Sequence, residues 1–168
     1  VMSAIRIAWF KVYKPLYYYA AFFSIRVDDF DIDTMIKGYN AIKTRYDDLM
    51  AKGFEVTNKE TNIIESLHIA LEATARGIKF APISLEKSDA TRFIVDEEHE
   101  NTLIPPFKTI DGLGVTVAKT IVEAREQGPF LSKEDLQKRG KVSKTLTDKM
   151  TEMGILNDLP DSNQLSLF

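Results

Sequence analysis

The segment 110–121 is the strongest candidate for chemistry in this sequence. Gly112 and Gly114 flank the apolar Leu113, and a helical pattern follows directly, with Lys119 one turn inside it. Glycine lets the backbone turn tightly and lets a bulky anion approach. The first N–H groups of a helix lack intrahelical partners and form an anion site. The residues expected to form this site are Gly112, Leu113, Gly114, Val115, Thr116 and Lys119, with Leu113 anchoring the turn in the core.

An ordinary turn between two helices is the alternative interpretation of two spaced glycines. The dinucleotide-binding fingerprint does not apply, because its third glycine and preceding long strand are missing. Ala118, Ile121 and Arg125 follow at helical spacing and favour a helix-hairpin-helix, which contacts the nucleic-acid backbone without regard to base identity. Residues 131–154 resemble a degenerate second copy, in which Val142 takes the role of Leu113. The cations expected to contact DNA from this copy are Arg139, Lys141 and Lys144.

The last five residues, 164–168, read Gln-Leu-Ser-Leu-Phe at the end of a polar tail. Spaced apolar side chains outside any periodic element are typical of a peptide that fills a groove on a partner. A terminus that folds back onto its own domain is the alternative. The residues expected to bind the partner are Gln164, Leu165, Leu167 and Phe168.

Composition predicts a soluble globular protein, with 44% hydrophobic and 28% charged residues among 168. The absence of cysteine excludes disulfides and thiolate metal sites and fits a cytoplasmic location. The net charge of −3 is unevenly distributed: residues 108–149 carry nine basic and six acidic side chains. No uncharged apolar stretch is long enough to cross a membrane. The apolar helical pattern that begins at Val1 suggests a piece of a larger protein.

The periodicities predict a mainly α fold with a small β patch, an α+β class with a tandem helix-hairpin-helix module and a flexible C-terminal tail. Helices are expected at 1–13, 15–24, 34–52, 58–76, 115–127, 133–139 and 144–153, and β-rich runs at 78–85, 92–95 and 102–104. Asp33 is the expected N-cap of the helix at 34–52, and Thr57 with Glu60 matches a capping box.

Other polar groups have simpler explanations than catalysis. The four carboxylates Asp28, Asp29, Asp31 and Asp33 suggest a metal site, but helix capping and the helix dipole explain their place before a helix. His68 is expected to be structural and His99 a solvated turn residue. We therefore expect no catalytic residue, metal or cofactor in this chain.

Several further segments resemble one known family. Besides Gly112-Leu113-Gly114, they are Ile104-Pro105-Pro106-Phe107, residues 133–140 and 164–168, and near the start Ala8-Trp9-Phe10-Lys11 with Tyr13-Lys14-Pro15. Together they resemble the C-terminal end of PolC-type bacterial DNA polymerase III alpha subunits. The resemblance implies a region that binds primer–template duplex behind the polymerase active site, with residues 164–168 as a tether to the sliding clamp. The Mg²⁺-binding catalytic domain and the 3′–5′ exonuclease of that family would lie elsewhere, so this part would bind but not catalyse.

The resemblance also implies a division of the chain. Residues 1–24 would end a fingers-like helical domain, 25–107 would form a helical segment with a small sheet, 108–156 the tandem helix-hairpin-helix, and 157–168 the tail with the clamp-binding motif. The expected partners are duplex DNA, the sliding clamp and the remainder of the polymerase chain, with no membrane. Two alternatives remain open: a helix-hairpin-helix domain of a DNA repair or recombination protein, and a protein-interaction domain that does not bind DNA.

Overall fold

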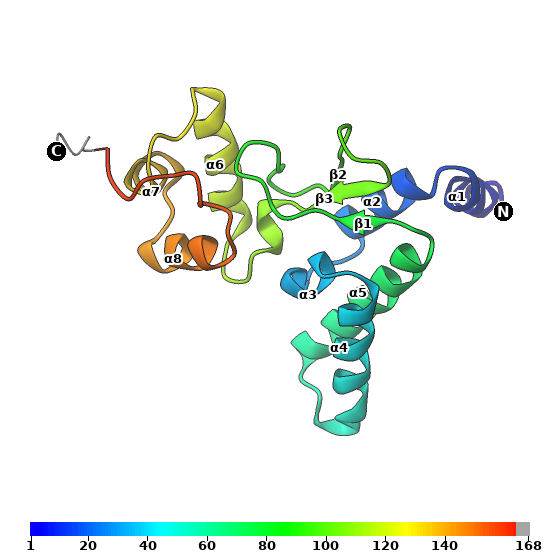
Figure 1. The fold of residues 1–168 in the computed structure, drawn as a ribbon. Coiled ribbons are helices and arrows are strands. Elements are labelled where there is room, and N and C mark those ends of the chain that lie inside the picture. The colour runs from blue at the N-terminus through cyan, green and yellow to red at the C-terminus, as the bar shows by residue number, and fades with distance from the viewer. Residues whose placement is uncertain (164–168) are drawn as a thin grey trace. The chain divides into compact units, whose positions relative to one another are not determined.

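The computed structural model describes residues 1–163, and within them the chain forms two compact units. The first unit comprises residues 1–82 and 92–105, and the second comprises residues 83–91 and 106 onward. Helices dominate both units and a single small sheet lies in the first, which confirms the expected fold class (Figure 1). Within the described residues, no helix is long and apolar enough to cross a membrane.

The first unit is built around an aromatic cluster. Phe23 comes from α2 (Pro15–Ile25), and its ring centroid lies 5.4 Å from those of both Phe80 and Phe93. Phe30 packs on Phe93 at the same centroid distance. Rings at these separations bury large apolar areas and attract one another in tilted or edge-to-face arrangements. The apolar helix α1 (Met2–Tyr13) precedes α2 and has no buried residue.

The small sheet has the strand order β1-β3-β2. Strand β3 (Thr102–Ile104) lies in the centre, parallel to β1 (Lys79–Phe80) and antiparallel to β2 (Ile94–Val95). All three strands fall within the β-rich runs expected from the sequence, and the polar turn at 96–101 joins β2 to β3 as a hairpin. The expected β patch is therefore confirmed.

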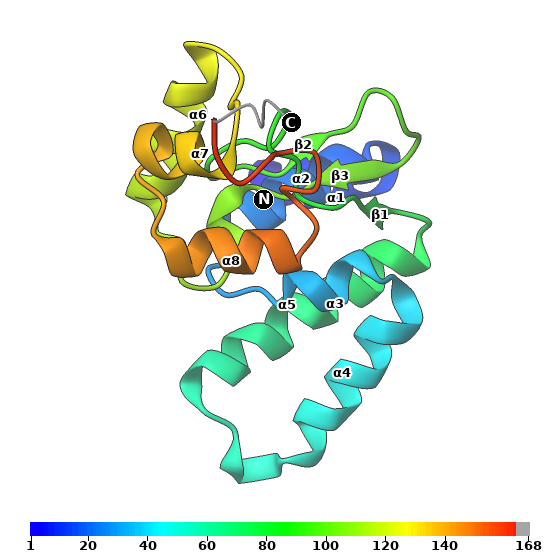
Figure 2. The same ribbon diagram turned by 60° about the vertical axis from the view of Figure 1, so that its left-hand side comes forward.

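One helix expected from the sequence is two helices in the structure. The span 34–52 is divided into α3 (Ile32–Ile36) and α4 (Tyr39–Ala51), because Gly38 adopts φ +90°, outside the helical region. The N-cap is Asp31, whose carboxylate accepts from the Thr34 N–H, so the prediction of Asp33 as the cap was wrong. The change of direction at Gly38 lets α4 run beside α5 (Figure 2).

The long helix α5 (Asn58–Ala75) begins with the capping box that the sequence predicted. The Glu60 N–H donates to the Thr57 hydroxyl at 3.2 Å, and the Thr57 N–H donates to the Glu60 carboxylate at 2.9 Å. A short 3₁₀ turn, η1 (Gly53–Glu55), connects α4 to this cap. The two bonds confirm the prediction. The capping box could be predicted from the sequence because both bonds join residues three positions apart.

The second unit contains a 3₁₀ turn, η2 (Phe107–Thr109), and the helices α6 (Val115–Glu126), α7 (Lys133–Gly140) and α8 (Lys144–Glu152). All three helices lie within two residues of the bounds expected from the sequence. The loop 83–91 belongs to this unit because Arg125 of α6 donates to the Leu85 and Ser88 carbonyls, at 3.0 and 2.8 Å. The core consists of Ile83, Ala90, Phe107, Ile110, Leu113, Ala118, Ile121, Ala124, Phe130, Leu136, Val142, Met150 and Leu156.

The chain beyond α8 returns to the beginning of α7. The Lys133 and Glu134 N–H groups donate to the Pro160 and Asp161 carbonyls at 2.9 and 3.1 Å, and the Lys133 ammonium pairs with the Asp161 carboxylate at 2.8 Å. The Ser132 hydroxyl donates to the Asn163 side chain. These bonds attach the first part of the expected tail to the unit. The candidate clamp-binding residues Gln164, Leu165, Leu167 and Phe168 lie outside the described residues.

Candidate nucleic-acid interface

The first hairpin connects η2 to α6 by a tight turn. The Leu113 N–H donates to the Ile110 carbonyl at 3.0 Å, and Gly112 adopts φ +87°, a value that glycine reaches without strain. The Leu113 side chain is only 4% exposed, so it anchors the turn in the core. Gly114 is the N-cap of α6 with φ −73°. The turn therefore presents the backbone of α6 at its start while its one large side chain points inward.

The start of α6 differs from the starts of the other two helices in this unit. Helices α7 and α8 begin with Ser132 and Ser143, whose hydroxyls accept from backbone N–H groups at 3.0 and 3.3 Å. Helix α6 begins at Gly114 without a side-chain cap, and Val115 and Thr116 are exposed. Its first N–H groups remain available to an anion, which the positive end of the helix dipole also attracts.

The second hairpin repeats the backbone pattern of the first. Lys141 adopts φ 53° and ψ 37°, the left-handed conformation at the place that Gly112 has in the first hairpin. Val142 follows, 4% exposed, where the first hairpin has Leu113, and Ser143 then caps α8. The order of left-handed residue, buried residue, cap and helix is the same in both hairpins. The tandem relation expected from the sequence therefore extends to the local backbone geometry.

Helix α8 contacts the first hairpin directly. The Lys149 ammonium donates to the Asp111 carbonyl at 3.0 Å and lies 3.5 Å from the Asp111 carboxylate. A methyl group added at Gly112 would lie 3.8 Å from the Leu146 side chain of α8. Lys149 also neutralises the acidic residue nearest to the glycines, which favours the approach of an anion.

The basic residues of the second unit fall into two groups, according to whether their side chains already interact with other groups of the protein. The first group already has interaction partners and consists of Lys87, Lys108, Arg125, Lys133, Lys138, Arg139 and Lys149. In the second group, Lys119, Lys141 and Lys144 are exposed and make no hydrogen bond or ion pair within residues 1–163. These three lysines belong to α6 and to the second hairpin. Free ammonium groups are therefore concentrated at the two hairpins.

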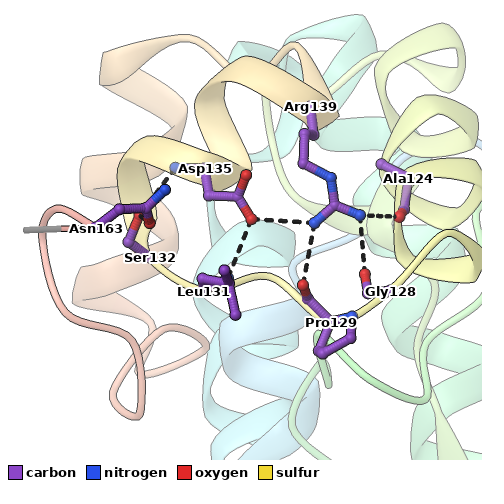
Figure 3. Close-up of polar contacts among 8 residues, drawn as sticks. All are labelled: Ala124, Gly128, Pro129, Leu131, Ser132, Asp135, Arg139 and Asn163. Carbon is purple, nitrogen blue, oxygen red and sulfur yellow. Dashed lines mark hydrogen bonds and ion pairs between the residues drawn. The ribbon is translucent and has the colours of Figure 1, made fainter.

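Arg139 is engaged inside the protein. Its guanidinium donates to the Gly128 carbonyl at 2.9 Å and to the Pro129 carbonyl at 3.0 Å, and also to the Ala124 carbonyl (Figure 3). It pairs with the Asp135 carboxylate at 3.0 Å. The Arg139 guanidinium therefore contacts the end of α6 and the connection between α6 and α7.

Comparison with known proteins fits this geometry. The sequence profile of the helix-hairpin-helix motif family matches residues 77–165, more than half of the chain. The chain belongs to the helix-hairpin-helix family. The match begins directly after α5 and spans the sheet strands and both hairpins of this helix-hairpin-helix chain.

Relatives along the whole length of this helix-hairpin-helix chain are polymerases. It is 55% identical over all 168 residues to DNA polymerase III PolC-type of Bacillus subtilis, of which it spans 12%. The corresponding proteins of Listeria monocytogenes and Latilactobacillus sakei are 53% and 51% identical over the full chain, which spans 11% and 12% of them. The resemblance expected from the sequence is thus confirmed.

The structure also adds residues to the helix-hairpin-helix site that the sequence analysis missed. Lys149 and Asp111 are far apart in the sequence, and no local pattern signals their contact. The Asp135 carboxylate binds the Arg139 guanidinium, a pair that the sequence analysis did not predict. The spacing of four residues between Asp135 and Arg139 on one helix was an available signal for that pair.

The other polar clusters of this helix-hairpin-helix chain have structural partners. Asp31 caps α3 and accepts from Arg45 at 2.9 Å, which supports capping over a metal site. Asp96, Glu98 and His99 place ligand atoms within 4.8 Å of one another in the β2–β3 turn. In this turn the Asp96 carboxylate accepts from the Glu98 N–H at 2.9 Å. The His99 Nδ1 lies 2.8 Å from the same carboxylate, as in an ordinary polar turn.

Proposed function

We propose that the second unit binds duplex DNA through its phosphate groups, without preference for base sequence. The observation that carries this proposal is the coincidence of three unpaired lysines with two hairpins of the same backbone geometry. All other cations of the described part of the unit already have partners. Contacts to phosphate position a protein on DNA but carry no base information.

The first hairpin supplies a backbone site. Gly114 has open space within 4 Å of where a side chain would begin, so a phosphate oxygen can approach the N–H groups at the start of α6. Lys119 lies one turn further along the helix and is exposed, so its ammonium can pair with the same phosphate. A charge-assisted contact of this kind is stronger than one between neutral groups.

The second hairpin supplies side-chain contacts. Ser143 uses its hydroxyl to cap α8, so an anion here meets fewer free N–H groups than at α6. Lys141 and Lys144 compensate with two exposed ammonium groups on either side of that cap. Two hairpins that each hold a phosphate would grip the backbone of a duplex at two places.

A salt titration tests the DNA proposal. Fluorescence anisotropy with a random-sequence duplex should give a slope of log K against log salt of about −0.9 per phosphate neutralised. Changing Lys119 to Ala should make that slope shallower by about 0.9 and weaken binding at every duplex sequence. The matched control is Lys138→Ala, which removes an exposed lysine paired with Glu134, and its slope should equal that of the unaltered chain. Equal slopes for both variants would contradict the phosphate role.

For the parent protein, we propose a replicative DNA polymerase of the PolC type in the cytoplasm, with this chain as a part that holds the duplex. The support is the full-length identity of 51–55% to proteins with that name. DNA synthesis, exonuclease activity and the Mg²⁺ that they require are then functions of other parts of the parent. A chain that carries this part alone should bind primer–template duplex and incorporate no nucleotide.

We also propose that residues 164–168 bind the sliding clamp. The support is their composition together with the bonds that hold Pro160, Asp161 and Asn163 beside α7, so that the pentapeptide begins at an attached point. Calorimetry with purified clamp should give an affinity of order micromolar for the chain. The chain without residues 164–168 should show no heat of binding while its affinity for duplex DNA stays the same. An unchanged clamp affinity would overturn the tether and leave the DNA proposal standing.

A further inference from the structure

The Arg139 side chain lies in the last turn of α7 and is 28% exposed. Its two terminal nitrogens each have two acceptors: Pro129 O and Asp135 Oδ2 for one, Ala124 O and Gly128 O for the other (Figure 3). The guanidinium also lies over the Phe130 ring, 4.9 Å from its centroid. A planar fork can serve several fixed acceptors at once, whereas an ammonium cannot reproduce that geometry.

The carbonyl acceptors of Arg139 belong to one short stretch of the chain. The carbonyls lie between 124 and 129, where α6 ends and the connection to α7 begins. The last carbonyls of a helix lack intrahelical partners, so a cation there is doubly favoured, by hydrogen bonds and by the helix dipole. Arg139 thus attaches the end of α7 to the end of α6.

Asp135 holds the guanidinium in this position from α7 itself. Its carboxylate accepts from Arg139 and from the Leu131 N–H, at 3.0 and 3.1 Å. Burial would raise the pKa of Asp135, but the bonds from Leu131 and Arg139 outweigh it and lower that pKa. Asp135 therefore stays charged near neutral pH, and α7 carries a rigid arginine–carboxylate pair.

We propose that Arg139 is a positioning residue for DNA binding: it holds the second hairpin in place against α6 and makes no phosphate contact itself. The hairpin begins at Gly140, the residue after Arg139, and carries Lys141 and Lys144. Helix α8, which follows the second hairpin, is attached to the first hairpin by the hydrogen bond from the Lys149 ammonium to the Asp111 carbonyl. Without the arginine, the second hairpin keeps its lysines but loses the polar attachment to the end of α6. This inference rests on the proposed DNA binding.

Arg139→Lys is the discriminating variant because it keeps the charge and removes the fork. A phosphate contact that depended on charge alone would survive in Arg139→Lys, since an ammonium binds phosphate as a point charge. If Arg139 is a positioning residue, neither lysine nor glutamine can replace it. Arg139→Lys and Arg139→Gln should then each weaken duplex binding by about tenfold, a loss of about 1.4 kcal/mol. Near-normal binding by Arg139→Lys would overturn the proposal.

A double-mutant cycle adds a readout that a purely structural role would not change. Lys144→Ala should weaken binding in the unaltered chain but have little further effect beside Arg139→Lys, because the second hairpin is already displaced. Lys119→Ala, on the first hairpin, should weaken binding equally in both backgrounds. Equal effects of Lys144→Ala in the two backgrounds would show that Arg139 acts only on stability.

All variants are measured as the full 168-residue chain, at a temperature where circular dichroism shows them folded. If Arg139→Lys does not fold, Asp135→Asn serves instead, because it removes the charged partner and leaves the carbonyl acceptors in place. Asp135→Asn should show the same coupling to Lys144→Ala, and its absence would overturn the proposal. Failure of the unaltered chain to bind duplex would overturn the proposed function, a distinct outcome from normal binding by Arg139→Lys.

Discussion

Replacing Gly112 by alanine should destabilise the second unit through backbone conformation alone. Gly112 adopts φ +87°, where a residue with a Cβ atom is strained. The added methyl group would meet only the Leu146 side chain, at 3.8 Å, an ordinary van der Waals contact. Steric overlap therefore contributes little, and the cost is that of the left-handed conformation, about 1–2 kcal/mol. The free energy of unfolding from urea denaturation should fall by that amount.

The second hairpin provides the matched comparison. Lys141 occupies the equivalent position with φ 53°, so the strain is already present there. Lys141→Gly removes that strain, and the greater freedom of glycine in the unfolded chain offsets about 0.5–1 kcal/mol of the gain. The free energy of unfolding should therefore stay level or rise by up to about 1.5 kcal/mol. Equal stability of Gly112→Ala and the unaltered chain would refute the argument, and so would a loss for Lys141→Gly.

Three further predictions concern packing, capping and pH dependence. Gly140→Ala should cost about 1–3 kcal/mol in urea denaturation, because its methyl group would lie only 3.3 Å from Ile121 of α6 and as near to two other side chains. In the first unit, Thr57→Ala should cost about 1 kcal/mol through loss of the capping box. The hydrogen bond from Lys52 and then that from the Thr57 N–H lower the pKa of Glu60 from 4.5 to about 2. A lowered pKa stabilises the folded state above the unfolded value, so thermal melts should show this contribution lost between pH 4.5 and 2. Glu60→Gln should remove that part of the pH dependence.

Local signals in the sequence determined most of the secondary structure. The capping box at Thr57, the serine caps of α7 and α8 and the glycine pair before α6 each depend on residues within four positions. Such bonds form as soon as the helix forms, so their pattern can be read directly from the residue types. The tandem hairpins were predictable for the same reason, since a left-handed residue and a buried residue precede each cap.

The break at Gly38 shows where local signals were insufficient. Glycine in a helical pattern is often tolerated, and the periodicity of residues 34–52 continues across it. The decision came from packing, because α4 has to turn at Gly38 to lie along α5 while Asp31 pairs with Arg45. Asp31 rather than Asp33 then became the cap. Asp28, Asp29, Asp31 and Asp33 lie within six residues, so the sequence alone could not identify which of them is the cap.

The sequence by itself determined that residues 108–149 carry two hairpins, because hairpin geometry is local. Only the tertiary structure decided which cations are free to meet DNA. Arg139 and Lys141 are two residues apart and both positively charged. Arg139 binds carbonyls at the end of α6 and just beyond it, whereas Lys141 is exposed without a partner in the described residues. The partner of a long charged side chain depends on which acceptors the fold brings within about 3 Å of it, and those acceptors come from other elements.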